Sequence, residues 1–542
     1  MKKFIVLCLA GLLILAFSQP GYAQAPKLEF KASGFIDTQT FIGEGVPQYN
    51  SSPGNTDIWG VVNKNYARTT PSGTFGIGSA GWNRTQSNWE GRGHLKFDAV
   101  MGPNLSGTIY FEIDTYRWGT TFNTSAITRE ANTFGAWTTD RTAVEVKNVY
   151  VDVGLPYFGV AWPITVRVGA QPLGVRPNML MYTDGTGVTA GIKIDPVMLI
   201  PIYAKALEGL DFADDDVDVW GLHANAKIGT FTVGGYGLYY RMNTYPFYVQ
   251  TGPTIVAAGA SGNTGIIVQV PGTFKSHMWW LGGYVDGKAG PVSLNFDFVY
   301  DYGSVDERTL RDIGIIDIPN VKYEGWATRL KVDYPWEKFN FGAVGMYATG
   351  ADTRRTSSSG LPGSLTAGLP GAAGGRQSTR VAGYVTPPGA EQSSADQESI
   401  VVYGVEPGAT GGYGIAHMIN YAQVSRGGFG GTWFAKLYGS AKLLPWYKVT
   451  LQGLYIGDTT RHGDTLGNAV KYTGASLLRD DNFIGFELDF MNDIQIYSNL
   501  RFWIGAGYLF AGNALDVNNA GTGLNRAATN PWAFRTRLIY TF

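Results

Sequence analysis

The last eleven residues, 532–542, constrain the fold of this chain most strongly. In a strand, successive side chains point to opposite faces. One face would carry Trp532, Phe534, Thr536, Leu538, Tyr540 and Phe542, and the other Ala533, Arg535, Arg537, Ile539 and Thr541. The first face suits hydrocarbon, whereas the second, with two arginines, requires water. This pattern is typical of a transmembrane β-barrel strand, although a half-buried strand of a soluble sandwich would share it.

The N-terminus has the pattern of an export signal. Lys2 and Lys3 precede an apolar run over 4–17, and Gly21-Tyr22-Ala23 places small residues where a signal peptidase cleaves. We therefore expect residues 1–23 to be a signal peptide and residues 24–542 to form the mature protein. The only cysteine, Cys8, lies in the predicted signal, so the mature protein would have no disulfide and no thiol chemistry.

Composition limits the class of protein further. After the signal there is no run of 18 apolar residues, so membrane-spanning helices are excluded. Glycine accounts for 74 of 542 residues, and charged residues make up 16% against roughly 25% in soluble domains. The 42 basic and 43 acidic residues balance, which argues against a nucleic-acid surface. A chain of this kind would have to cross a membrane as a barrel.

Runs of about 10 to 14 residues with period two recur along the chain and predict strands. They are joined alternately by tight turns and by long polar connections, which predicts an all-β, antiparallel, up-and-down transmembrane barrel with short periplasmic turns and long extracellular loops. About eighteen strands are expected, and an even number suits a closed single-chain barrel. The predicted centres lie near residues 35, 94, 111, 148, 167, 191, 203, 223, 236, 283, 297, 328, 343, 436, 451, 487, 503 and 537.

Local signals predict where the strands turn or bend. Tight turns are expected at 102–104, 290–291, 335–336, 445 and 492–493, a bulge is expected beside Lys147, and Pro201 is expected to interrupt its strand. The connection over 350–429 is unusually long. It would be either an extracellular surface loop or a segment that folds inward and constricts the pore.

If the apolar face of each strand meets lipid, the charged face lines a lumen. The predicted basic pore-lining residues are Arg92, Arg167, Lys193, Lys205, Arg329, Lys331, Arg501, Arg535 and Arg537, and the acidic ones are Glu112, Asp114, Asp297, Asp301, Glu487 and Asp489. Barrel closure would bring Lys31 beside Arg501, Arg535 and Arg537 as a basic wall that favours anions. In the alternative interpretation, Glu487 and Asp489 pair with Arg501 and the lumen charges neutralise one another.

The sequence gives no sign of catalysis. The five histidines are dispersed without metal-ligand spacing, and no G-x-S-x-G motif is present. We therefore expect no catalytic residues, no metal site, no cofactor and no enzymatic activity.

Two short motifs resemble the alginate-export family of outer-membrane channels. They are Val149-Tyr150-Val151-Asp152-Val153 and the following Thr165–Pro172 stretch, which correspond to the family's Y-V-D strand and its strand ending in G-R-Q. The resemblance implies an eighteen-stranded monomeric barrel with a basic lumen that passes anionic polymers or small solutes. Ala170 stands where the family has arginine, so a small-solute porin is expected rather than a polyuronate exporter.

The predicted function is therefore an outer-membrane porin for passive passage of small hydrophilic solutes, with anionic solutes and saccharides as candidates. The expected partners are outer-membrane lipid and lipopolysaccharide, small solutes, and the barrel-assembly machinery, which would bind the C-terminal strand ending at Phe542; no nucleic acid is expected. The alternative is a barrel scaffold of an export or electron-transfer complex with a periplasmic partner.

Overall fold

The computed structural model describes a large part of the chain between residues 27 and 542. The described ranges are 27–44, 86–115, 144–155, 162–177, 179–208, 216–245, 274–307, 321–350, 380–387, 398–404, 430–461, 481–515 and 530–542, with short strands at 68–70, 73–75, 255–257, 266–268, 471–473, 476–479, 517–519 and 524–526. The predicted signal peptide, 1–23, lies outside them.

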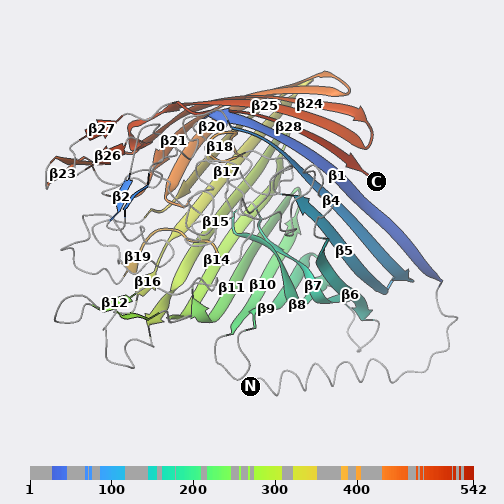
Figure 1. Ribbon diagram of the computed structural model, residues 1–542. Coiled ribbons are helices and arrows are strands. Elements are labelled where there is room, and N and C mark those ends of the chain that lie inside the picture. The colour runs from blue at the N-terminus through green and yellow to red at the C-terminus, as the bar shows by residue number, and fades with distance from the viewer. Residues whose placement is uncertain are drawn as a thin grey trace, which may run out of the picture.

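Eighteen long strands form a closed antiparallel barrel (Figure 1). Strand β28 pairs with β25 on one side and with β1 on the other, and β1 pairs with β4, so the sheet has no free edge at this seam. The fold class predicted from the sequence is confirmed, and every predicted centre falls within a strand. The wall consists of β1 (Leu28–Glu44), β4 (Gln86–Met101), β5 (Leu105–Thr115), β6 (Glu145–Leu155), β7 (Ile164–Val175), β8 (Met181–Ile194), β9 (Val197–Leu207), β10 (Val217–Ile228), β11 (Phe231–Tyr245), β14 (Phe274–Ala289), β15 (Val292–Glu307), β17 (Trp326–Trp336), β18 (Phe339–Ala348), β20 (Thr432–Leu444), β21 (Tyr447–Asp458), β24 (Phe483–Tyr497), β25 (Leu500–Ala511) and β28 (Trp532–Thr541).

The remaining elements are short. Strands β16 (Val321–Tyr323) and β19 (Arg380–Val381) add a parallel pair to the sheet beside β15. Four separate hairpins are β2 (Arg68–Thr70) with β3 (Gly73–Phe75), β12 (Ile255–Ala257) with β13 (Ile266–Val268), β22 (Lys471–Thr473) with β23 (Ser476–Arg479), and β26 (Val517–Asn519) with β27 (Leu524–Arg526). A 3₁₀ turn, η5 (Asn513–Leu515), follows β25. In the described part of the chain, no helix is long and apolar enough to cross a membrane.

The two ends of the barrel differ in their connections. One end, here the tight-turn end, has turns of two or three residues at 102–104, 195–196, 229–230, 290–291, 337–338, 445–446 and 498–499. The other, the long-loop end, carries most of the long connections. Two predicted turn positions are wrong: Pro335 lies within β17, opposite Asn340, and Asn492 and Asp493 lie within β24. Both strands run further than their apolar pattern indicated.

Two predicted irregularities are present. The β5–β6 register shifts where Lys147 has no partner on β5, which is the expected bulge. Pro201 pairs in register with Leu222 of β10 but interrupts the β8–β9 ladder, in which Thr189 pairs with Ile202 and Ile192 with Leu199. The missing N–H of proline accounts for a one-sided gap of this kind.

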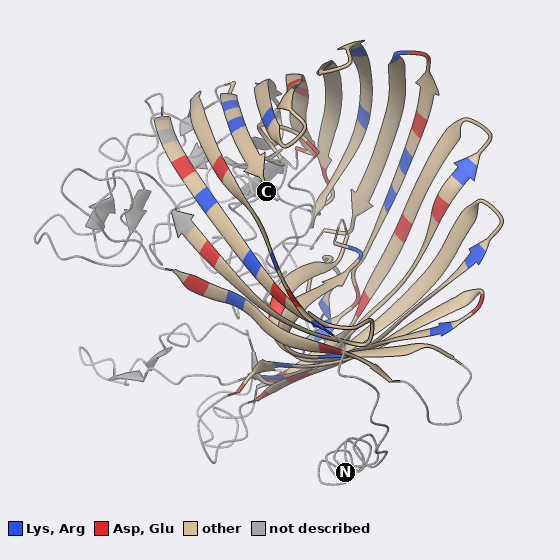
Figure 2. Ribbon diagram, turned by 90° about the vertical axis from the view of Figure 1, so that its right-hand side faces the viewer, with Lys and Arg blue, Asp and Glu red and all other residues tan. Residues whose placement is uncertain are grey.

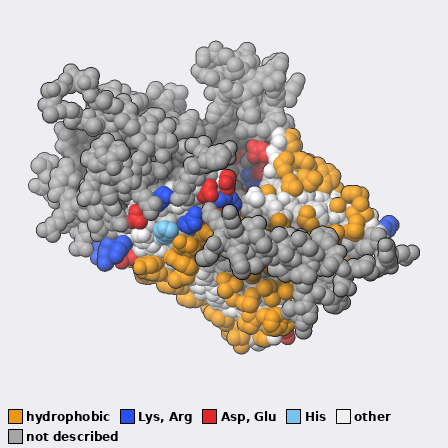
Figure 3. Space-filling model, turned by 90° about the horizontal axis from the view of Figure 1, so that it is seen from below, with side chains coloured by type: hydrophobic (Ala, Val, Ile, Leu, Met, Phe, Trp, Pro, Cys, Tyr) orange, Lys and Arg blue, Asp and Glu red, His pale blue; other side chains and the backbone are white. Residues whose placement is uncertain are grey.

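The wall has an apolar outward face and a polar inward face. Large hydrophobic side chains are exposed on the outward face, for example Leu437 at 71% and Leu451 at 59%, and Figure 3 shows such side chains over one side of the barrel. On β28, Leu538 and Tyr540 are about 40% exposed, whereas Arg535 and Arg537 on the opposite face are 3% and 5% exposed. The alternation predicted for the C-terminal segment is therefore the one that the strand adopts.

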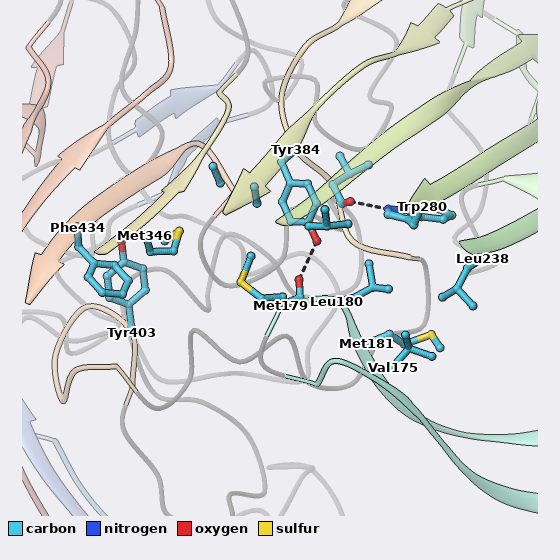
Figure 4. Packing of buried hydrophobic residues seen from close by; sticks show 14 of the residues in the cluster. Val175, Met179, Leu180, Met181, Leu238, Trp280, Met346, Tyr384, Tyr403 and Phe434 are labelled. Carbon is cyan, nitrogen blue, oxygen red and sulfur yellow. Dashed lines mark hydrogen bonds between the residues drawn. The ribbon is translucent and has the colours of Figure 1, made fainter. Parts of the chain in front are cut away.

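The barrel interior also contains an apolar core. It forms where the β7–β8 connection and two parts of the long β18–β20 connection pack against inward side chains of the wall. Met179 and Leu180 belong to the first, and Tyr384 and Tyr403 to the second (Figure 4). These inward segments fill part of the barrel interior.

Candidate functional site: the barrel interior

Charged residues are spaced along the strands of the wall, as Figure 2 shows. Strand alternation and register place most of the predicted pore-lining residues on the face opposite the exposed hydrophobic side chains. This inward set comprises Arg92, Arg167, Lys193, Arg329, Lys331, Arg501, Arg535, Arg537, Glu112, Asp297, Asp301, Glu487 and Asp489. Asp114 lies on β5 opposite Arg92 in register.

Lys205 was predicted to line the pore, but its side chain lies on the outward face. It is opposite Asp218 in register and shares its face with Tyr203, which is 39% exposed. The reason is that β9 is apolar on both faces: Ile202 and Ala204 point inward into the interior core, and Leu199 and Tyr203 point outward. Alternation of hydrophobicity therefore could not identify the lumen face of this strand.

Residues 398–404 of the long connection, here the Glu398 segment, are bound to the inward face of the wall. The Glu398 carboxylate accepts hydrogen bonds from Arg329 of β17, with N–O distances of 2.6 and 3.0 Å, and from the Lys436 ammonium of β20. Its carbonyl accepts from Gln452 of β21 at 3.0 Å. Burial by itself would raise the pKa of Glu398, but the two cations outweigh it and lower the pKa to about 2. Glu398 is therefore ionised while this segment is docked.

Two acidic side chains of β24 hold the backbone of the same segment. Glu487 accepts hydrogen bonds from the Ser399 hydroxyl at 2.8 Å and from the Val401 and Val402 amides at 2.5 and 3.0 Å. Asp489 accepts from the Ile400 amide at 3.2 Å. Backbone amides that bind a carboxylate in this way satisfy its charge without a cation.

This arrangement differs from the alternative interpretation, in which Glu487 and Asp489 pair with Arg501. The Arg501 guanidinium instead binds Asp493, with an Nε–Oδ1 distance of 2.6 Å. The two carboxylates of β24 face the Glu398 segment, whereas Arg501 lies near the tight-turn end.

Two glycines of β25 permit the close approach of this segment. A Cβ atom at Gly507 would lie 2.7 Å from Ile400 Cβ and 2.4 Å from Asp489 Oδ1, and one at Gly505 would lie 2.9 Å from Ile400 Cδ1. Ile400 is completely buried. The wall is therefore shaped to receive Ile400 as well as charged to bind its amide.

Residues 380–387, here the Tyr384 segment, dock on neighbouring strands. Asp301 of β15, with no exposed surface, accepts hydrogen bonds from the Gly325 amide at 2.8 Å and the Val385 amide at 2.9 Å. The Trp280 indole donates to the Val385 carbonyl at 2.8 Å, as Figure 4 shows. The Tyr384 hydroxyl donates to the Met179 carbonyl at 2.8 Å, so the β7–β8 connection and the long connection contact each other inside the barrel.

Arg176, which was not predicted from the sequence, fixes the β7–β8 connection. Its guanidinium donates to Asp297 at 2.5 and 2.8 Å and to Asp286 at 2.6 and 3.2 Å, and it lies 4.0 Å from the centroid of the Tyr284 ring. Strands β9, β10 and β11 separate β8 from β14 in the sheet, so Arg176 spans a chord of the barrel. Its φ of +43° is unusual for a residue other than glycine and is invisible in the sequence.

A second charged network lies on β4, β5 and β6. Glu112 is 2.8 Å from Arg92, 2.7 Å from Lys147 and 3.3 Å from His94. Nearby, Arg167 binds Asp152 on the adjacent strand at 2.7 Å. Cations and carboxylates of this part of the interior therefore neutralise one another.

The predicted basic wall at the seam does not form as expected. Arg537 binds Asp37 of β1, with an N–O distance of 2.6 Å, and Arg535 lies 5.2 Å from the centroid of the Phe41 ring. Lys31 is opposite Asp98 on β4 and lies beyond the end of β28, because Phe35 already pairs with Thr541. The sequence could not show the register of the seam, which sets these partners.

Among the described residues, no group of three or more His, Cys, Asp or Glu side chains has a geometry that would hold a metal ion.

Comparison with known proteins gives similarity at the level of solved structures. No protein-family model and no curated protein matches the chain. Among similar solved structures, Pseudomonas aeruginosa OpdQ has 10% sequence identity and a TM-score of 0.44, with coverage of 95% of this chain and 98% of that chain. P. aeruginosa OccK9 (OpdG) has 12% identity and a TM-score of 0.44, with coverage of 95% and 98%. The outer membrane protein opdK of the same organism has 9% identity and a TM-score of 0.43, with coverage of 94% and 99%.

Proposed function

We propose that this protein is a channel of the bacterial outer membrane for passive passage of small hydrophilic solutes. One observation carries the proposal: the closed eighteen-stranded wall is apolar outside and carries basic and acidic side chains inside. A barrel of this size cannot fill its interior with wall side chains alone. The apolar band suits lipid, and the tight turns would face the periplasm, as in other barrels of this class. The protein has no role as an enzyme in this proposal.

The inward segments would set the width of the passage. The Glu398 segment and the Tyr384 segment occupy part of the lumen beside β14 to β25, and Arg176 holds a third inward segment. Solutes would therefore be small. Of the inward charged residues predicted from the sequence, Asp301, Glu487 and Asp489 are covered by the inward segments, so residues outside this covered region, such as Lys193 and Lys331, would line the route. Because Arg537, Arg501 and Arg329 each bind a carboxylate, we propose weak charge selectivity rather than a strongly anion-selective pore.

The resemblance to alginate-export channels depends on two motifs in neighbouring strands. The two motifs lie on β6 and β7, where Asp152 is opposite Arg167 and Val149 is opposite Ala170. Ala170, at the position where the alginate-export family has arginine, and the ion pairs of the interior both favour small solutes over anionic polymers. Assembly through the C-terminal strand, which ends at Phe542 beside Gly34, and contact with lipopolysaccharide belong to the same proposal.

A liposome-swelling assay tests the proposal. The refolded mature chain, in liposomes loaded with a large impermeant dextran, should admit arabinose and glycine at rates above those of empty liposomes and should exclude stachyose. Folding is checked by β-rich circular dichroism. Correctly folded, inserted protein that admits none of the small solutes, in the wild type and in the Glu398→Gln variant, would overturn the channel proposal.

A further inference from the structure

The outward face of β9, β10, β11, β14 and β15 carries an aromatic row across five adjacent strands. Its members, matched in register, are Tyr203, Trp220, Tyr239, Trp279 and Tyr302. Trp220 and Tyr239 stack with centroids 5.7 Å apart, and Tyr239 and Trp279 are 4.5 Å apart. Aromatic side chains in such a position mark the boundary between hydrocarbon and headgroups.

A charged row runs parallel to the aromatic row, two residues closer to the long-loop end. In the same strand order it consists of Lys205, Asp218, Arg241, His277 and Ser304. Lys275, opposite Asp306, lies two residues beyond His277 toward the long-loop end. Arg or Lys on the outward face at mid-membrane depth would cost about 2 to 4 kcal/mol each. Because the charged row lies beyond the aromatic row, on the side away from the hydrocarbon, it is at headgroup level.

The charged row is ordered by its own contacts. The Lys205 ammonium lies 2.7 Å from Asp216 and 3.3 Å from Asp218, and the Tyr203 hydroxyl donates to Asp218 at 3.2 Å. Arg241 is 3.8 Å from Asp218, and its side chain is 30% exposed. The Tyr239 hydroxyl lies 2.7 Å from His277 Nδ1. Cationic groups are thus fixed directly above a stacked aromatic surface.

Three strands on another part of the barrel lack this pattern. On β18, β20 and β21 the outward aromatic residues Tyr347, Trp433 and Tyr455 are followed, toward the long-loop end, by Thr349, Gly431 and Gly457. In the described part of the barrel, these strands present no charged row above their aromatic residues. The β9–β15 face therefore differs chemically from the β18–β21 face.

We infer that the β9–β15 face is a binding site for a phosphate-bearing lipid of the leaflet at the long-loop end. Arg241, Lys275 and His277 would donate hydrogen bonds to the phosphate, since guanidinium and ammonium groups bind phosphate strongly. The aromatic row would contact the upper part of the acyl chains. Asp216 and Asp218 position Lys205, and Asp218 also lies 3.8 Å from Arg241. The inference rests on the proposed outer-membrane location, because that location presents this face to lipid headgroups.

Native mass spectrometry of the detergent-solubilised mature protein tests the site, with diphosphoryl lipid A as the probe and phosphatidylcholine as the zwitterionic control. We expect wild type to retain lipid A in preference to phosphatidylcholine, and Arg241→Gln with Lys275→Gln to lower lipid A affinity about tenfold. The matched control is Lys331→Gln with Lys448→Gln, which removes two inward cations and should leave lipid binding unchanged.

Unchanged lipid A binding in the outward double variant, or an equal loss in the inward control, would overturn the inference. Each variant must retain the wild-type unfolding midpoint in detergent. Arg241→Lys keeps the positive charge at this position and should retain most of the wild-type affinity for lipid A. Solute uptake separates this test from that of channel function. The outward variant should admit solutes as wild type does, and a wild type that binds lipid A but admits no solute would refute the channel alone.

Discussion

The Arg537 guanidinium and the Asp37 carboxylate, 2.6 Å apart, join the last strand of the barrel to the first. Their side chains are 6% and 0% exposed, and Arg537 Nε donates to both Asp37 oxygens, at 2.9 and 2.8 Å. Asp37 also accepts from Gln39 at 2.9 Å. The seam that closes the barrel is thus held by a buried ion pair as well as by its backbone ladder.

Arg537→Ala should destabilise the barrel by about 3 kcal/mol, because it leaves the Asp37 charge buried without its cation. The double variant Arg537→Leu with Asp37→Leu should be less destabilised than Arg537→Ala, since it leaves no orphaned charge. Urea unfolding in lipid vesicles, followed by tryptophan fluorescence, gives both values. Equal losses of stability in the single and double variants would show that the Asp37 charge is not destabilising without Arg537.

Acid should release the Glu398 segment. The pKa of Glu398 is about 2 when the segment is docked, against 4.5 ordinarily. A lowered pKa stabilises docking fully above pH 4.5, and this stabilisation is lost as the pH falls from 4.5 toward 2. We expect the conductance per channel to rise between pH 5 and pH 3, and the rise to be reduced in Glu398→Gln. A wild-type conductance independent of pH in this range would contradict the docking role of Glu398.

Gly507→Ala should displace Ile400 and widen the passage, because the new Cβ would lie 2.7 Å from Ile400 Cβ. We expect a larger single-channel conductance and faster cleavage of the long connection by added protease. Gly345→Ala is the matched control, since a Cβ there meets no atom within 4 Å, and it should behave as wild type. Identical conductance in the two variants would show that Ile400 does not limit the passage.

Arg176→Lys should destabilise the protein by about 1 to 3 kcal/mol, because lysine cannot reproduce the forked contacts with Asp286 and Asp297. Arg167→Lys is a useful comparison. Arg167 binds one carboxylate on an adjacent strand and its side chain is 32% exposed, so its replacement should cost less than 1 kcal/mol. Thermal unfolding in detergent compares the two variants, and an equal loss would argue against a special role for the chord that Arg176 spans.

The wall of the barrel was predictable because alternation and turn spacing act locally. On strands with one apolar and one charged face, such as β28 and β17, Arg535, Arg537 and Arg329 lie on the face opposite the exposed hydrophobic side chains. Alternation of hydrophobicity does not identify the inward face where both faces of a strand are apolar. On β9 the interior core buries Ile202 and Ala204, so hydrophobicity did not distinguish inside from outside and Lys205 was misassigned.

The content of the lumen was not predictable, because it depends on contacts between residues far apart in sequence. Glu398 lies 69 positions from Arg329, and Arg176 lies 121 positions from Asp297. No local pattern marks Glu398 as the partner of two wall cations. The seam partners of Arg537 likewise depend on the register of β28 against β1, which only the folded barrel fixes.

Single-channel recording of refolded residues 24–542 in a planar bilayer shows whether the barrel conducts. We expect stepwise, ohmic conductance in wild type, with larger steps in Glu398→Gln because the inward segment is less firmly held. Inserted, folded protein that gives no steps in either the wild type or the variant would refute the channel.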